Sequence, residues 1–163
     1  MRPEGEMFLR FAGFLCVFAA MAVWEAAAPR RMLTVGRRVR WPGNLGLVIL
    51  DAALLRLVLP AGAVGVAAFA EARGWGLLGV WPVPDLAAVV LAVAALDLAV
   101  YLQHVLFHAV PALWRLHRVH HADLDFDATT GVRFHPGEVL LSLGIKMAVV
   151  AVLGAPALAV LIF

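Results

Sequence analysis

Residues 85–108 read DLAAVVLAVAALDLAVYLQHVLFH, a run that is mostly apolar until histidines appear near its end. A transmembrane helix needs about 20 consecutive, mostly apolar residues, and residues 85–106 meet that requirement. The stretch therefore predicts a membrane-spanning helix that carries histidines close to its C-terminal end.

The composition of the whole chain agrees with this prediction. Hydrophobic residues make up 64% of the 163 residues and charged residues 15%, whereas soluble proteins average about 45–50% and about 25%. The net charge is only +2, and most arginines stand at the ends of apolar runs, so we expect no nucleic-acid partner. The single cysteine, Cys16, excludes an intrachain disulfide and a cysteine-based metal site.

Four apolar runs are long enough to cross a membrane: residues 7–24, 45–70, 85–106 and 139–163. Prolines and glycines separate them, as helix breakers do. The sequence therefore predicts an all-α fold, a multi-pass transmembrane helical bundle with about four spanning helices. We expect a single membrane domain over residues 1–163.

The first run has two interpretations. WEAAAP at residues 24–29 resembles a signal-peptide cleavage site. The next segment, PRRMLTVGRRVR at residues 29–40, carries five arginines, and such a cluster resists transfer across a membrane. The arginines favour a membrane anchor over a cleaved signal peptide.

The arginines also predict orientation, because cytoplasmic loops are enriched in Lys and Arg. If residues 29–43 are cytoplasmic, residues 71–84 lie outside with Arg73 alone, and the segment after the third run lies inside with Arg115, Arg118 and Arg133. The histidines then face the cytoplasm. The richness in Ala, Arg and Val suggests a bacterial inner membrane.

Five of the six histidines lie within residues 104–121. His104 and His108 are four residues apart, so on a helix they share one face. Pro111 interrupts the helix. His117, His120 and His121 follow it and fall within a sector of roughly 100° on a second helical piece. Imidazole is the commonest metal ligand in proteins, so this clustering predicts a metal site formed by both helical pieces.

Asp97 and Tyr101 form a polar stripe with the first two histidines along the third apolar run. We expect one of them to hydrogen-bond a metal-binding imidazole. The alternative is a polar contact between helices, for example from Asp97 to Arg56. His135, the sixth histidine, either joins the metal site or anchors the last run at the interface.

The types and spacing of the candidate ligands argue against some functions and limit which metals the site would bind. The zinc-protease motif needs Glu directly after the first histidine, and HVLFH has Val there. An ion transporter normally places polar groups mid-membrane on several helices. Imidazole ligands without thiolate suit Fe, Zn, Cu or Ni.

HVLFH (104–108), LWRLHRVHH (113–121) and DLDFDATTGVRFHPGEVLLS (123–142) together resemble the fatty acid hydroxylase / sterol desaturase superfamily of integral-membrane oxidoreductases. The resemblance implies a helical bundle with a cytoplasmic histidine-rich site over residues 104–135. The metal ligands it implies are His104, His108, His117, His120 and His121. Support of the loop and site is implied for Asp127, Thr129, Thr130 and Arg133.

The resemblance also implies the chemistry. Such enzymes use two iron ions, dioxygen and an external electron donor (a reductase, a ferredoxin or a cytochrome b5-like protein) to hydroxylate or desaturate a membrane lipid. Zinc is a possible substitute in purified protein. Substrate, metal identity and oligomeric state stay open.

The chain departs from the family pattern in one respect. A third cluster, another HxxHH, follows the last membrane hairpin in the family and is missing here. Five or six imidazoles suit one metal ion, whereas two iron ions need more ligands. We therefore expect the N-terminal part of a longer family domain, or else an incomplete member with a structural or metal-binding role. A metal or proton transporter is a third hypothesis.

Overall fold

The computed structural model describes residues 3–81 and 83–163, with side chains from residue 11 onward, and these residues form helices and no strand. The helices are α1 (Pro3–Ala27), α2 (Arg37–Val58), α3 (Gly62–Ala72), α4 (Leu77–Val80), α5 (Asp85–Ala109), α6 (Pro111–His121), α7 (Ala128–Gly131), α8 (Pro136–Leu153) and α9 (Ala157–Ile162). The all-α prediction is confirmed for the described residues.

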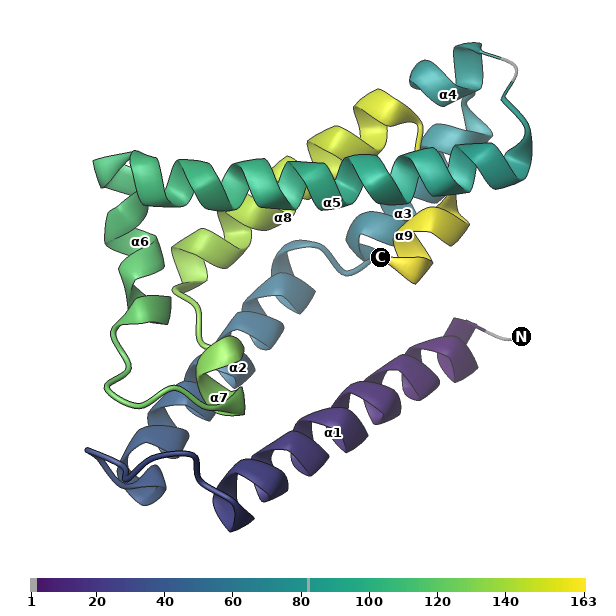
Figure 1. Cartoon of the computed structure of the whole chain (residues 1–163). Coiled ribbons are helices and arrows are strands. Elements are labelled where there is room, and N and C mark those ends of the chain that lie inside the picture. The colour runs from purple at the N-terminus through teal and green to yellow at the C-terminus, as the bar shows by residue number, and fades with distance from the viewer. Residues whose placement is uncertain (1–2, 82) are drawn as a thin grey trace.

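The helices build an elongated bundle with two different ends (Figure 1). α2 and α3 run from one end to the other, α5 runs back, and α8 crosses again in the first direction. We call the end that holds α6, α7 and the start of α2 the histidine end. The opposite end, where α4 and the turn from α8 into α9 lie, is the far end.

Two of the expected spans are broken helices rather than single ones. Residues 45–70 divide between α2 and α3, with Pro60 in the turn between them. Residues 139–163 divide between α8 and α9, because Gly154 takes a left-handed conformation (φ 65°) and Pro156 follows it. Proline lacks the N–H that a continuous helix needs, and left-handed glycine is a frequent helix end.

A core of small side chains joins α3, α5, α8 and α9. Its buried members are Ala67, Ala92, Leu96, Val150, Ala155, Ala159 and Val160. Small residues let helix backbones approach closely, which is how helices associate within membranes.

Two glycines make the tightest backbone contact at the far end. Gly76 (φ 90°) precedes α4, and Gly154 (φ 65°) ends α8. A Cβ on Gly76 would overlap the backbone of Gly154, and a Cβ on Gly154 would overlap the carbonyl oxygen of Trp75. Only glycine satisfies both the left-handed conformation and the close approach.

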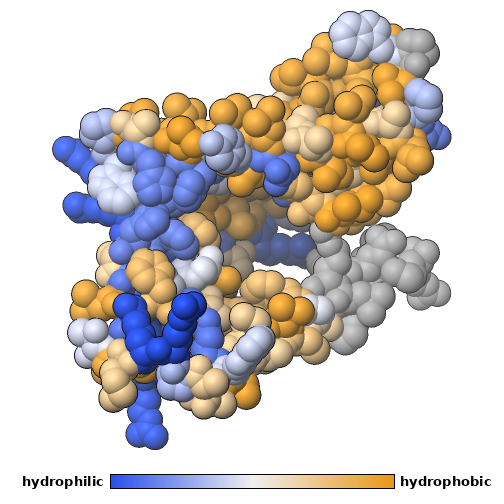
Figure 2. All heavy atoms as spheres, viewed as in Figure 1, coloured by the Kyte–Doolittle hydropathy of each residue, from blue (hydrophilic) through white to orange (hydrophobic). Residues whose placement is uncertain are grey.

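Among the residues that the structure describes with side chains, three helical stretches are long and apolar enough to cross a membrane: Arg37–Val80, which includes the α2–α3 break, Asp85–Ala109 and Pro136–Leu153. Phe11–Ala27, the part of α1 with described side chains, is a shorter apolar helix. The structure thus gives three candidate spans against the expected four, and the fourth stays a prediction. Figure 2 shows apolar side chains covering the bundle toward the far end and polar ones gathered at the histidine end.

Candidate metal centre

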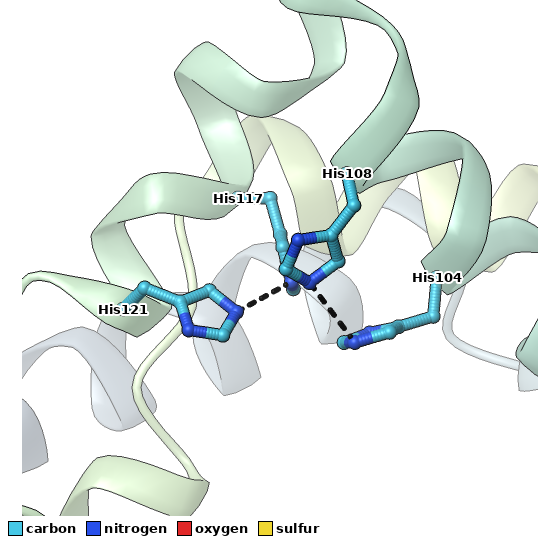
Figure 3. A group of neighbouring side chains, drawn as sticks. All are labelled: His104, His108, His117 and His121. Carbon is cyan, nitrogen blue, oxygen red and sulfur yellow. Dashed lines mark hydrogen bonds between the residues drawn. The ribbon is translucent and has the colours of Figure 1, made fainter.

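The corner between α5 and α6 brings two pairs of histidines together. Val110 is extended (φ −97°, ψ 118°) and Pro111 occupies the first turn of α6, a position where proline's missing N–H costs nothing. α6 therefore leaves the end of α5 at a sharp corner (Figure 1). His104 and His108 from α5 now face His117 and His121 from α6 (Figure 3).

The four imidazoles converge on one small volume. One ligand nitrogen from each ring lies within 4.8 Å of the other three. Nε2 of His108 is 3.2 Å from Nε2 of His104, and Nε2 of His121 is 3.2 Å from Nε2 of His117. Ring nitrogens this close repel through their lone pairs unless a proton or a cation lies between them. The arrangement suits a shared metal ion.

Desolvation and neighbouring imidazoles keep two histidines of α6, His117 and His121, in the form that binds metals. Burial lowers the pKa of His117, and the neighbouring imidazoles of His108 and His120 lower it further. The pKa of His121 is lowered by desolvation and then by the neighbouring imidazoles, of which His120 has the largest effect. Neutral imidazole is the metal-binding form, so both effects favour ligation near neutral pH.

Glu138 orients one of these rings from behind. Its Oε1 lies 2.7 Å from Nδ1 of His117, and both side chains are buried, with 5% and 1% of their surface exposed. The N–H at Nδ1 donates to the carboxylate, which leaves the Nε2 lone pair pointing into the cluster. Metal-binding histidines usually carry such a carboxylate partner. No spacing pattern in the sequence singles out Glu138, although it follows HPG in the first turn of α8, within the stretch DLDFDATTGVRFHPGEVLLS.

His120 stands beside the cluster rather than in it. Its Nδ1 donates to the carbonyl oxygen of Arg133 (3.3 Å), and its ring stacks on Phe134 at 4.8 Å with an interplanar angle of 2°. The ring centre is 5.0 Å from that of His121. This bond fixes the tautomer and leaves the Nε2 lone pair available.

His135 caps α8. Its Nδ1 accepts a hydrogen bond from the backbone N–H of Gly137 at 3.0 Å, so in the neutral ring Nε2 carries the proton. Of the two roles considered for this residue, the structure places it at the helix start that positions Glu138.

The polar stripe on α5 divides into two parts. His104 reaches the cluster, whereas the side chains of Asp97 and Tyr101 are exposed on the helix. Arg56, the alternative partner of Asp97, has its guanidinium 3.5 Å from the carbonyl oxygen of Pro60. The partner of a clustered imidazole is Glu138, and a supporting role for Asp97 or Tyr101 stays a prediction.

A buried network holds the segment after α6 in place. Arg40 of α2 donates to Asp123 (2.8 Å) and Asp127 (2.6 Å) and to the backbone carbonyl of Asp125. Asn44 donates to Asp123 (2.8 Å) and Thr129 (2.9 Å). Asp127, Thr129 and Thr130 were expected to support the loop, and they lie in this network. The participation of Arg40 and Asn44, about 80 residues away, has no local sequence signal.

The acidic residues of the network are held ionised. The backbone N–H groups of Val35 (2.7 Å) and Thr34 (3.0 Å) lower the pKa of Asp125. Burial raises the pKa of Asp123, but hydrogen bonds from Asn44, Thr130 and Arg40 outweigh it, so this pKa is lowered too. These charged, hydrogen-bonded carboxylates hold the segment between the histidine cluster and α7 in place.

The donor set fits one transition-metal ion. Four neutral imidazoles satisfy a tetrahedral ion, or part of the sphere of an octahedral one. Within the described residues, no second group of three or more His, Cys, Asp or Glu side chains is close enough to hold another ion. The described residues therefore supply donors for one metal ion, whereas the family resemblance implies two iron ions.

Comparison with known proteins finds one family match, which covers this part of the chain. A family model, fatty acid hydroxylase, matches residues 89–163, which include most of α5 and all of α6, α7, α8 and α9. No curated protein and no solved structure gives a match. The match and the apolar helices indicate an integral membrane protein. The matched residues, 89–163, contain all six histidines of the chain and resemble the fatty acid hydroxylase family.

Proposed function

We propose that the chain is the metal-binding part of a membrane oxidoreductase that hydroxylates or desaturates a C–H position of a lipid, with dioxygen as co-substrate. The four-imidazole cluster at the ends of apolar helices, within a fatty acid hydroxylase match, carries this proposal. A bound iron ion would supply the redox chemistry, which amino-acid side chains do not provide.

The residues of the chain have separate tasks in this scheme. His104, His108, His117 and His121 hold the metal, and Glu138 keeps His117 in the correct tautomer. The apolar walls of α2, α5 and α8 deliver a hydrocarbon from the bilayer without moving it into water. Arg40 and the acidic network keep α6 and α7 in register with α2.

The electron balance of the reaction requires an external electron donor. Hydroxylation inserts one oxygen atom of O₂ into a C–H bond and reduces the other to water, which consumes two electrons and two protons. Desaturation removes two hydrogen atoms and, with two further electrons and two protons, reduces both oxygen atoms to water. We propose an external donor, a reductase, a ferredoxin or a cytochrome b5-like protein, that reaches the histidine end from the cytoplasm.

A second function is favoured by one observation. The described residues bring together donors for one metal ion only. A member of the family that binds a metal without oxygenase activity, as a structural or metal-binding membrane protein, fits this donor set as well.

Lipid analysis of cells grown under ¹⁸O₂ separates the two functions. We expect cells that express the chain to contain a lipid with either an ¹⁸O-labelled hydroxyl group or a new double bond, and cells that express His121→Ala to lack it. Bound metal without either product would support the structural role and contradict the oxidoreductase.

A further inference from the structure

A second hollow lies at the histidine end, where the chain passes from α1 to α2 (Figure 1). Its volume is about 580 Å³, within the range of about 300–1,000 Å³ that is typical of small-molecule pockets. We call it the arginine pocket, because Arg30, Arg31 and Arg37 line it. None of the clustered histidines lines it, so it is separate from the metal centre.

Two of these arginines carry a positive charge that no carboxylate neutralises. Arg30 is exposed and has no hydrogen-bond or ion-pair partner among the described residues. Nη2 of Arg37 donates to a neutral acceptor, the backbone carbonyl oxygen of Glu25, at 2.6 Å. Nε of Arg37 is buried and has no hydrogen-bond partner within the described part of the chain. Buried donors are almost always satisfied, so this N–H is a donor available to a bound ligand.

The third arginine is only loosely paired. Nη2 of Arg31 lies 3.7 Å from Oδ1 of Asp125, and the Arg31 side chain is 61% exposed. Both oxygens of Asp125 already accept backbone N–H groups. An exposed ion pair of this length contributes little, so Arg31 adds to the positive potential of the pocket.

Two carboxylates also line the pocket, and both already accept hydrogen bonds. Asp127 accepts from Arg40 at 2.6 Å, which neutralises it. Glu25 accepts from the backbone N–H of Ala128 at 2.8 Å. Three guanidinium groups therefore face a single uncompensated carboxylate, and the pocket is suited to an anion.

The pocket lies at the depth of the lipid head groups. α1 ends at Ala27, and the spanning stretch that includes α2 begins at Arg37. Head groups lie directly outside the hydrocarbon that spanning helices cross. Leu33 and Phe126 belong to the pocket wall, and Phe126 is 62% exposed. These apolar side chains are suited to the part of a lipid that adjoins its head group.

We propose that the arginine pocket binds the phosphate group of an anionic phospholipid of the bilayer. Guanidinium groups form paired hydrogen bonds with phosphate oxygens, and basic residues beside the membrane attract anionic lipids. Arg30 and Arg37 bind the head group, and Phe126 packs against the lipid. Since Phe126 lies in the segment between the histidine cluster and α7, the bound lipid also holds that segment against the end of α1. The inference requires neither a bound metal nor lipid oxidation.

Displacement of fluorescent phosphatidylglycerol from the whole chain, purified in detergent, tests the proposal. The fluorophore is attached to the end of an acyl chain, so the head group is unaltered. We expect phosphatidylglycerol, which is anionic, to displace the probe at a concentration about tenfold or more below that of phosphatidylcholine, which has no net charge. Glycerol 3-phosphate, which has the phosphate but no acyl chain, should compete poorly.

Arg30→Gln removes a cation that holds nothing else in the described structure. We expect it to weaken phosphatidylglycerol binding about fivefold and to leave the midpoint of thermal unfolding unchanged. Arg30→Gln combined with Arg37→Gln should abolish the preference for the anionic lipid. Arg38→Gln is the matched control, because Arg38 is exposed and adjoins Arg37 but does not line the pocket. This variant should keep the preference.

Three outcomes would overturn the proposal. The first is equal displacement by the two phospholipids. The second is a loss in Arg38→Gln as large as that in Arg30→Gln, which would mean that the charge of the whole segment, and not the pocket, attracts the lipid. The third is competition by glycerol 3-phosphate as effective as that by phosphatidylglycerol, which would make a soluble phosphate compound the ligand.

Discussion

Glu138 shows what a residue contributes when its partner is a metal-binding imidazole. Its carboxylate lies 2.7 Å from Nδ1 of His117, and both side chains are almost wholly buried. The bond fixes the ring and the tautomer at once. The metal affinity expected of His117 therefore depends on its hydrogen bond to Glu138.

Glu138→Gln should therefore weaken metal binding. An amide at this position keeps the size of the side chain but loses the charge that raises the basicity of His117. We expect the metal affinity to fall about 10–100-fold, measured by competition with a chelator in detergent. Asp85→Asn, which changes an exposed carboxylate at the start of α5 far from the histidines, is the comparison and should leave the affinity nearly unchanged. An equal loss in both variants would contradict the assignment.

The carboxylate of Asp125 makes stability depend on pH. The backbone N–H groups of Val35 and Thr34 lower its pKa in the folded protein below the unfolded value of about 3.9. The unfolded chain therefore takes up the proton first, so the stabilisation is complete above about pH 5 and is lost as pH falls through the folded pKa.

Asp125→Asn should remove part of this dependence. We expect a lower midpoint of thermal unfolding at neutral pH, because one of the two backbone donors then meets an amide N–H₂ group. Thermal unfolding in detergent between pH 3 and 7 measures both effects. Asp85→Asn, at an exposed carboxylate, should lose little. A variant whose stability falls with acid as steeply as the unchanged protein would refute the assignment.

At the residue scale the sequence predicts which histidines cluster better than it predicts the residues that hold them in place. The spacing of His104, His108, His117 and His121 is a local helical pattern, so it can be read from a short stretch. Glu138 and Arg40 act across turns and between helices that are distant in the chain, and no periodicity reports such contacts. Asp97 and Tyr101 share a helix face with His104, but they lie about two turns and one turn away from it along α5, and both side chains are exposed.

At the scale of elements, hydropathy locates the apolar runs but not where they bend. Residues 45–70 and 139–163 are apolar throughout most of their length, yet both are broken. The residues that break these helices can be seen in the sequence: Pro60 in the first run, and Gly154 with Pro156 in the second. A window that averages hydropathy is insensitive to a single residue without an N–H or with a positive φ.

Gly154→Ala tests the contact that fixes the end of α8. The alanine would hold a strained left-handed conformation and its Cβ would overlap Trp75. We expect a loss of at least about 1–3 kcal/mol from the backbone conformation alone, seen as a lower midpoint of thermal unfolding. Gly144→Ala lies in the same helix with open space around it and should be neutral or slightly stabilising. Equal midpoints for the two variants would be inconsistent with the structure.

At the scale of the whole molecule, three features lie at the histidine end: the histidine cluster, the arginine-rich segment before α2 and the acidic network. The positive-inside rule predicts that this end faces the cytoplasm and that the far end faces the opposite side.

Cysteine labelling tests that orientation. In a Cys16→Ser background, Leu124→Cys marks the histidine end and Trp81→Cys marks the far end; each native side chain is 65% exposed. An impermeant maleimide applied to cells with permeabilised outer membranes should label Trp81→Cys and reach Leu124→Cys only after lysis. The reverse pattern would place the metal centre on the outer side.

The most direct test of the metal centre is X-ray absorption at the metal edge of protein purified in detergent. We expect about one transition-metal ion per chain with about four nitrogen ligands of imidazole type, at about 2.0–2.1 Å if the ion is zinc. The imidazole signature should weaken in His117→Ala. A chain that purifies without a transition metal, or with an ion bound by oxygen ligands alone, would contradict the central claim that His104, His108, His117 and His121 form one metal site.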